Sequence, residues 1–377
     1  MKIIILKEKL AKGLSMVEKI TGRNFTLPIL NNVLISAEDN SLKLSTTDLE
    51  LGISYWGLAK VEEKGEITIP VKTLSSFVSL IGEEKVTIES KEKTLYLKGE
   101  NYKTQIKGLE AKDFPIIPEV VSDKWIEFDA TTFCKGIMLV MDFCALTQVR
   151  PELSGLYFVF QKNSAKIVAT DSFRLAEKSI ALDGATQGID GPQSFILPRN
   201  AARELVNIFS EHNGKIKFYL SPSQIMVESY VDETKNPQAR LVSRLIEGEY
   251  PDYEAVIPKE FKTRLTLSRE EFSNQIKIAS LFSGRTNEVK LEISPKKGNV
   301  LISSQSVDLG ETESKMAIDA SGDDVEISFN YKFLSEGLNQ IKSEKIVLEL
   351  NGQDGPGVLK SSDDSTYIYV IMPIKAS

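Results

Sequence analysis

A unit of short strands and amphipathic helices occurs three times along the 377 residues, and this repetition limits the possible folds more than any other feature. Each copy opens with a short strand pattern, at residues 2–6, 125–128 and 264–267. A helical pattern follows, with apolar residues three or four positions apart, as expected for a helix that packs on a sheet. Asp129 and Ser268 are the expected N-caps of two of these helices. The apolar positions are Leu10, Leu14 and Val17; Phe133, Ile137, Val140 and Cys144; and Phe272, Ile276 and Ala279.

The first two copies share a fixed register. Gly13 and Gly136 each lie inside a helical pattern and are 123 positions apart, and Thr47-Asp48 and Thr170-Asp171 have the same spacing. Because a glycine inside a helix costs roughly 1 kcal/mol relative to alanine, its recurrence indicates common descent or a shared close contact. A recurring Thr-Asp pair is more typical of a structural turn cap than of an active site.

Each copy also has a second helix, which in the first two copies begins after a proline, Pro70 or Pro198. Proline suits a helix start, where its missing N–H is not needed. The proline-containing segments 113–118 and 249–258 are typical of linkers. The sequence therefore predicts an α+β protein of three tandem domains, residues 1–120, 121–253 and 254–377. Each domain should contain two helices and about eight strands.

Composition argues against several classes of protein. No apolar run approaches the roughly 20 residues that span a bilayer. The apolar run at residues 3–6 is too short for a signal-peptide core, so we expect a cytoplasmic protein without a membrane partner. Cys134 and Cys144 would lie about 15 Å apart along a helix, too far for a disulfide, and are expected to be core thiols. With His212 as the single histidine, metal sites and histidine-based catalysis are not expected.

The sequence contains no pattern typical of catalysis. It lacks G-x-x-x-x-G-K-[ST], G-x-G-x-x-G after a strand, and G-x-S-x-G. Acidic pairs such as Asp323-Asp324 and Asp363-Asp364 are typical of solvated turns. We therefore expect no catalytic residues and no cofactor. Two alternatives remain at this point: an α+β enzyme, which would need a polar cluster in one repeat only, and a non-catalytic repeat scaffold.

Basic residues are concentrated on the repeated helices, although the chain has a formal net charge of −7. Lys12, Lys72 and Lys332 are examples. Ordinary solvated helix faces are the simpler interpretation of this bias. The alternative is a basic surface, formed by equivalent helices side by side, that contacts phosphates without reading bases.

The C-terminal run at residues 367–375 is almost continuously apolar. Such a run is typical of a strand that is buried on both faces, whereas Pro373 predicts that its end lies at a sheet edge. Core packing and an exposed apolar groove for a partner are equally compatible with this pattern.

Five stretches resemble the bacterial DNA polymerase III beta subunit, the sliding-clamp family, in order and over the full length of the chain. They are TLPIL at 26–30 with TDLE at 47–50, DFP at 113–115, VATDSFRL at 168–175, EYPDY at 249–253 and YVIMPI at 369–374. Each is weak alone, but all five at the right spacing within a threefold repeat are highly specific.

The resemblance implies three copies of a DNA-clamp domain, each with two helices packed on antiparallel sheets, and a homodimer that forms a six-domain ring. It implies a processivity factor that encircles duplex DNA without sequence preference and has no catalytic activity. Its implied partners are the DNA polymerase III alpha subunit, the clamp loader, and other polymerases and repair proteins that carry short peptide motifs. A nucleoid-associated cytoplasmic location follows from this role.

The resemblance also implies three sets of functional residues. The partner-peptide groove maps onto Leu153, Thr170, Arg174, Leu175, Pro251, Val256, Tyr331, Val370, Met372 and Pro373. The DNA-binding positions are Arg23, Gln148 and Arg199, to which the helix charges add Lys12, Lys72 and Lys332. The dimer interface maps onto Thr104, Ile106 and Leu281. Ser172-Phe173 before Arg174 departs from the family pattern of Gly-His or Gly-Tyr, which affects the specificity of the groove.

Overall fold

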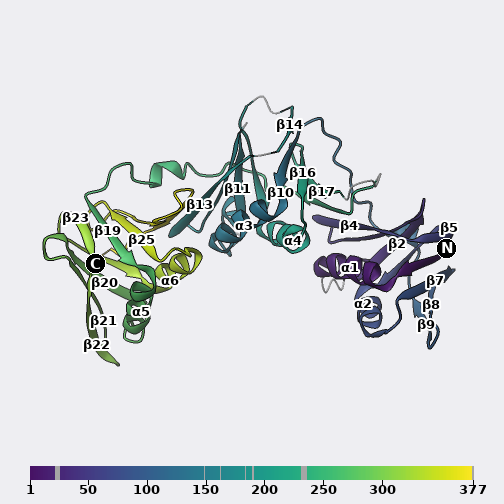
Figure 1. Cartoon of the computed structure of the whole chain (residues 1–377), viewed down its shortest axis with the longest axis horizontal. Coiled ribbons are helices and arrows are strands. Elements are labelled where there is room, and N and C mark those ends of the chain that lie inside the picture. The colour runs from purple at the N-terminus through teal and green to yellow at the C-terminus, as the bar shows by residue number, and fades with distance from the viewer. Residues whose placement is uncertain are drawn as a thin grey trace.

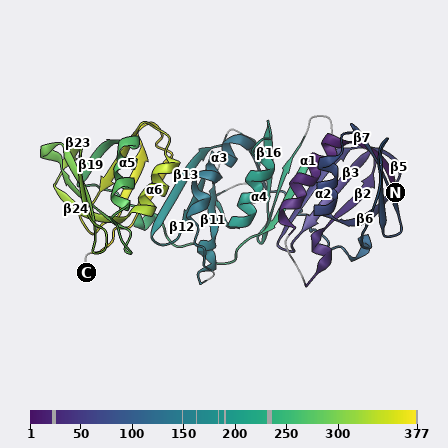
Figure 2. The same cartoon turned by 90° about the horizontal axis from the view of Figure 1, so that it is seen from below.

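The computed structural model of the chain describes residues 1–21, 26–147, 149–161, 163–182, 184–188, 191–230 and 236–375. These residues form a crescent of three lobes, with the N-terminus in one end lobe and the C-terminus in the other (Figure 1). The helices lie along the concave side and the sheets form the convex side. Seen from below, the helices stand in a row across all three lobes (Figure 2).

The first lobe contains two helices, α1 (Lys7–Val17) and α2 (Val71–Leu80). Its strands are β1 (Lys2–Leu6), β2 (Asn32–Glu38), β3 (Ser41–Thr47), β4 (Leu51–Leu58), β5 (Lys60–Glu63), β6 (Gly65–Pro70), β7 (Lys85–Lys91), β8 (Thr94–Lys98) and β9 (Lys103–Lys107).

The second lobe contains α3 (Ala130–Val140) and α4 (Arg199–Phe209). Its strands are β10 (Trp125–Asp129), β11 (Gly155–Phe160), β12 (Ser164–Thr170), β13 (Arg174–Ala181), β14 (Thr186–Gln187), β15 (Gln193–Pro198), β16 (Lys215–Leu220), β17 (Gln224–Ser229) and β18 (Ala239–Arg244).

The third lobe contains α5 (Arg269–Ser280) and α6 (Tyr331–Gln340). Its strands are β19 (Thr263–Ser268), β20 (Glu288–Ser294), β21 (Asn299–Ser306), β22 (Gly310–Ala317), β23 (Asp319–Gly322), β24 (Val325–Asn330), β25 (Lys345–Leu350), β26 (Gly357–Ser361) and β27 (Tyr367–Ile371). Each described lobe thus has two helices and nine strands, close to the two helices and about eight strands expected. The division of the chain at residues 120 and 253 stays a prediction.

Antiparallel sheets run through the boundaries between lobes. Strands β4 of the first lobe and β18 of the second pair directly, with Gly52 opposite Val242. Strands β13 of the second lobe and β27 of the third pair in the same way, with Leu175 opposite Val370. We call these contacts the first joint and the second joint. Each joint merges strands of two lobes into one nine-stranded sheet.

The core lies between the helices and the inner faces of the sheets, as one connected apolar cluster that extends through all three lobes. Phe128, Phe133, Phe160 and Phe218 form its centre in the second lobe, with ring centroids 4.4–6.5 Å apart. Two smaller apolar clusters lie apart from this core. Val120, Met226 and Val242 form one at the first joint, and residues around Leu175 and Val370 form the other at the second.

Local sequence signals explain several helix starts. The side chains of Asp129 and Ser268 accept hydrogen bonds from the backbone N–H groups of Thr132 and Glu271, which confirms both predicted N-caps. Pro70 and Pro198 end a strand and sit at the N-cap position of the following helix. The polypeptide therefore passes from sheet to helix without an intervening loop.

The recurring helix glycines are close contacts. A Cβ atom added to Gly13 would lie 2.3 Å from Cδ1 of Tyr55, and one added to Gly136 would lie 2.4 Å from Cδ1 of Ile180. Both helices thus approach a strand of the sheet so closely that only glycine fits. Cys134 and Cys144 are buried free thiols, as predicted, and burial raises the pKa of each to about 12.

Candidate functional site

An apolar groove with a cavity volume of about 220 Å³ lies at the second joint. Three segments that are far apart in the sequence form it: residues 150–175, the linker at 251–256, and the end of β27. The second lobe, the linker and the third lobe therefore all contribute to one site. Its lining residues are Arg150, Leu153, Thr170, Ser172, Arg174, Leu175, Pro251, Asp252, Tyr253, Val256, Val370 and Met372.

The turn between β12 and β13 forms one wall. Thr170 Oγ1 donates to the carbonyl of Arg174 (2.7 Å), and Oδ1 of Asp171 accepts from the backbone N–H groups of Phe173 and Arg174 (both 3.0 Å). Ser172 adopts a φ of 78°. Thr47 and Asp48 make the equivalent bonds in the first lobe, where Leu49 has a φ of 81°. The Thr-Asp pair is therefore the structural turn cap that its repetition indicated.

The end of β27 forms the second wall. Tyr367, Tyr369 and Ile371 point into the main core, whereas Val370 faces the groove side together with Leu175. The strand pairs with both β13 and β26, so the prediction of a sheet edge is wrong. Pro373 lies beyond the last strand residue and removes no ladder hydrogen bond. The two interpretations of this run both hold, one on each face of the strand.

The linker forms the third wall and is held by aromatic packing. The rings of Tyr157 and Tyr250 stack with centroids 4.6 Å apart, and Tyr253 meets Tyr157 edge-on at 6.3 Å. Burial raises the pKa of both linker tyrosines well above the usual range. Lys166 Nζ donates to Glu254 at 2.9 Å. These contacts fix the positions of Pro251 and Val256 at the groove.

The first joint has no equivalent opening at the matching position. Gly52 corresponds to Leu175 in the repeat, and a Cβ added to Gly52 would lie 2.6 Å from Cγ2 of Ile117. The linker side chain of Ile117 therefore covers the position that remains open as a groove at the second joint.

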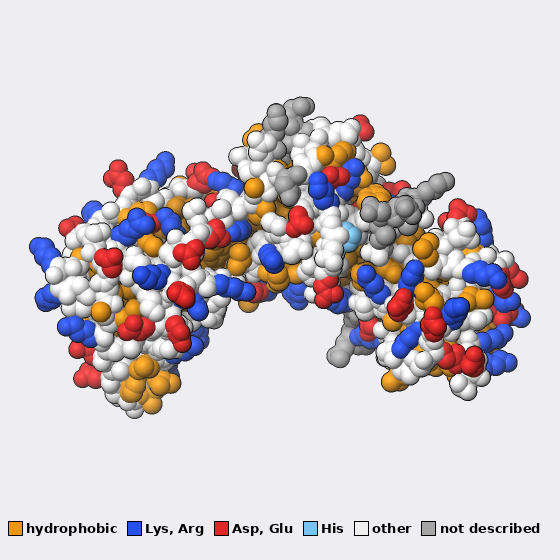
Figure 3. Space-filling view, in the orientation of Figure 1, with side chains coloured by type: hydrophobic (Ala, Val, Ile, Leu, Met, Phe, Trp, Pro, Cys, Tyr) orange, Lys and Arg blue, Asp and Glu red, His pale blue; other side chains and the backbone are white. Residues whose placement is uncertain are grey.

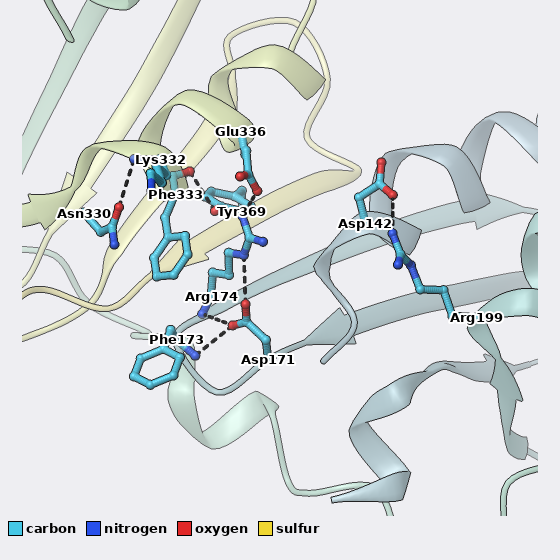
Figure 4. Close-up of polar contacts among 10 residues, drawn as sticks. All are labelled: Asp142, Asp171, Phe173, Arg174, Arg199, Asn330, Lys332, Phe333, Glu336 and Tyr369. Atoms are coloured by element: carbon cyan, nitrogen blue, oxygen red, sulfur yellow. Dashed lines mark hydrogen bonds and ion pairs between the residues drawn. The ribbon is translucent and has the colours of Figure 1, made fainter. Parts of the chain in front are cut away.

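Arg174 joins the second and third lobes beneath the groove (Figure 4). Its Nε donates to Asp171 at 3.0 Å, and its Nη1 donates to Glu336 of α6. Its guanidinium lies over the rings of Phe143 and Phe333, at 5.1 and 4.6 Å from their centroids. Burial lowers the pKa of Arg174, but the hydrogen bond to Glu336 and the nearby charges outweigh it and raise the net value.

Eight of the ten predicted groove residues line the groove together. Tyr331 and Pro373 do not line it. On α6 it is Phe333, two residues after Tyr331, that meets Arg174, because successive helix positions point about 100° apart. Sequence reasoning missed the lining residues Arg150, Ser172, Asp252 and Tyr253, although Ser172, Asp252 and Tyr253 lie inside stretches that it singled out.

The predicted DNA-binding lysines lie on the helices of the concave side. Lys12, Lys72 and Lys332 are exposed on α1, α2 and α6. Arg199 is different, because its Nε donates to the carbonyl of Met141 (3.0 Å) and its Nη2 to Asp142 (2.8 Å). Arg23 and Gln148 lie outside the described residues. The concave helices therefore present exposed lysines, while Arg199 is tied to the end of α3.

The predicted dimer residues lie at the two ends of the crescent. Thr104 and Ile106 belong to β9, an edge strand of the first lobe. Leu281 is 67% exposed at the end of α5, near the exposed turn residues Val307 and Leu309 that precede the edge strand β22. Apolar side chains also gather at the lower tip of the third lobe (Figure 3). Each end of the crescent thus offers an unpaired strand beside apolar surface.

Two negative findings concern the described residues only. They contain no cluster of three or more histidine, cysteine or acidic side chains that would hold a metal ion. None of their helices combines the length and the apolar character that crossing a membrane requires.

Comparisons with known proteins cover the whole chain. Models of the DNA polymerase III beta subunit match in order: the N-terminal domain at residues 1–118, the central domain at 129–252 and the C-terminal domain at 254–375. The beta sliding clamp of Synechococcus elongatus is 27% identical over 381 residues, covering 100% of this chain and 99% of that protein. That of Staphylococcus epidermidis is 27% identical over 391 residues, with the same coverage. A crystal structure of a DnaN sliding clamp from Pseudomonas aeruginosa bound to griselimycin superposes with a TM-score of 0.92 at 25% identity, covering 100% of both chains.

Proposed function

Because the chain belongs to the DNA polymerase III beta subunit family and is a DNA sliding clamp, we propose that two copies close into a ring around duplex DNA and tether the replicative polymerase. The beta subunit is a non-catalytic component of its polymerase, so the enzyme alternative is set aside. We further propose that the protein acts in the cytoplasm, on the nucleoid.

The crescent shape with helices on its concave side is the observation that carries this proposal. Two such crescents joined end to end enclose a channel that is lined by helices and walled by sheets. The helices offer Lys12, Lys72 and Lys332 to phosphates. Contacts of this kind position DNA without reading its sequence, so we propose that the ring slides on duplex DNA of any sequence.

The two joints within the chain predict the contact between chains. Strand β18 of the second lobe, and its equivalent β27 in the third, each pair with the edge strand of the preceding lobe, β4 or β13. The equivalents that remain unpaired are β9 of the first lobe and β22 of the third. We propose that β22 of one chain pairs with β9 of the next, which gives unlike surfaces at a contact that closes after two copies.

The ladders also give the register of this third joint. Gly52 faces Val242 at the first joint, and their equivalents Leu175 and Val370 face each other at the second. Following the strand pairs through the third and first lobes places Glu311 of β22 opposite Gln105 of β9. Thr312 then faces Thr104, and Glu313 faces Lys103. The pairing therefore brings opposite charges together and places Ile106 beside the apolar turn that precedes β22.

We propose that the groove at the second joint binds short peptide segments of the DNA polymerase III alpha subunit, the clamp loader and other polymerases and repair proteins. Leu153, Leu175, Val370 and Met372 offer it apolar surface. Burying a large apolar anchor contributes roughly 1.5–3 kcal/mol before ordering costs. Two or three anchors therefore correspond to affinities on the order of micromolar.

Retention on DNA of different topology tests the ring. After loading by a bacterial clamp loader with ATP, the protein should stay on nicked circular DNA at a salt concentration that abolishes direct binding, because release requires a joint to open. On linearised DNA it should be lost rapidly by sliding off the ends. Equal loss from both forms would contradict encirclement. A Leu281→Asp variant should sediment as a monomer and lose retention on circles.

A further inference from the structure

We propose that the groove discriminates against peptides with a carboxylate beside their apolar anchors, and that Glu336 sets this preference by occupying Arg174. The inference rests on the proposed peptide-binding role of the groove and specifies its partner. Arg174 is the basic side chain most deeply set in the groove lining, with 11% of its side chain exposed. Its availability to an incoming carboxylate therefore decides how the groove treats an acidic peptide.

The guanidinium of Arg174 is already enclosed by the protein. Phe143 of the second lobe and Phe333 of the third lie against it. Asp171 accepts from Nε and Glu336 accepts from Nη1, so two carboxylates balance one positive charge. A peptide carboxylate would have to displace one of these partners, and a neutral amide or carbonyl faces no such competition between like charges.

The other charged residues around the groove lead to the same conclusion. Arg150 also lines the groove, but its Nε donates to Glu152 at 2.9 Å. Asp252 lines it as well, is exposed, and has no ion pair in the described part of the chain. Two basic side chains are thus accompanied by four acidic ones: Glu152, Asp171, Asp252 and Glu336. The groove surroundings therefore have a negative balance, although two arginines line the groove.

Glu336 acts through Arg174, since it does not itself line the groove. It projects from α6 in the third lobe, is about half exposed, and meets Arg174 from the side opposite the turn that holds Asp171. Removing its charge should leave Arg174 in place between the two rings and free one of its N–H groups for a peptide. Glu336 is therefore a positioning residue that determines specificity.

Two matched peptides test the preference. Both are ten residues long and contain two adjacent leucines, and they differ only in a Gln or a Glu that precedes the leucines. Binding to the full-length protein is measured by isothermal titration for the natural chain, Glu336→Gln and Asp252→Asn. Glu344→Gln is the control, because it removes the same charge from an exposed position in the turn after α6.

The natural protein should bind the Gln peptide about three- to tenfold more tightly than the Glu peptide, a ratio typical of a like-charge contact near a surface. Both test variants should reduce this ratio, Glu344→Gln should not, and added salt should reduce the ratio in the natural protein. Equal affinities for the two peptides, or a ratio unchanged in both test variants, would overturn the preference and leave the groove intact. If neither peptide bound, the groove itself would be wrong, and the preference with it.

Discussion

Gly13 and Gly136 pack against the sheet at distances that a side chain does not fit. Gly13→Ala should lower the stability of the first lobe by about 1–2 kcal/mol, because overpacking costs more than the roughly 1 kcal/mol of helix propensity gained. A lower urea midpoint would report the loss. Gly82→Ala is the control, since no atom lies within 4 Å of a Cβ built at Gly82. Equal stability of the two variants would contradict the close contact.

His212, the single histidine, follows α4 in a turn. Burial lowers its pKa, and the positive charge of Lys12 lowers it further. Its contribution to the unfolding free energy is therefore present above the unfolded pKa of about 6.5 and is lost as the pH falls through the folded pKa. The imidazole C–H signal in NMR should titrate at a lower pH in the native chain than in urea. A native midpoint at or above the unfolded one would refute this.

At the residue scale, the sequence located most of the groove but not its polar contacts. The family pattern carried Leu153, Leu175, Val370 and Met372 to one site because each lies in or beside a recognisable stretch. It did not distinguish Tyr331 from Phe333, since that choice depends on the rotation of α6 about its axis. Nor did it predict the ion pair between Arg174 and Glu336, because the two residues are 162 positions apart and belong to different lobes.

At the scale of single elements, the two unpaired edge strands carry opposite charges. Lys103→Glu should weaken the dimer, because two acidic side chains would then face each other in the proposed register; like charges directly opposite are destabilising. A second change, Glu313→Lys, should restore the dimer by reversing the pair. Sedimentation at micromolar concentration measures both effects. If Glu313→Lys failed to rescue Lys103→Glu, the register would be wrong.

Among the elements, the helices were the most predictable, because apolar spacing and N-caps are local signals. The three opening helices and their partners occur where the patterns placed them. The end of β27 was misjudged, because Pro373 was taken to mark a sheet edge, whereas the strand ends at Ile371 before the proline. Which strands pair across a joint depends on contacts such as Gly52 with Val242, and these leave no periodic signal in the sequence.

At the scale of the whole molecule, peptide binding and ring closure use different ends of the lobes and should be separable. Met372→Asp places a charge in the apolar groove and should weaken binding of a polymerase-derived peptide at least tenfold, since an uncompensated charge there is costly. Fluorescence anisotropy reports this loss. The variant should still sediment as a dimer and stay on nicked circles. Loss of the dimer in Met372→Asp would show that the two functions are coupled.

The shared construction of the joints has a kinetic consequence. The first and second joints are closed by linkers that keep their strands at an effective concentration on the order of millimolar. The third joint has the same ladder but no linker, so its partner must be recruited from dilute solution. With equal ladders, a lost contact at a linked joint re-forms before its strands diffuse apart, whereas a lost contact at the unlinked joint does not. The covalent connectivity of the chain therefore selects where the ring breaks, and any machine that opens it needs to act on that seam alone.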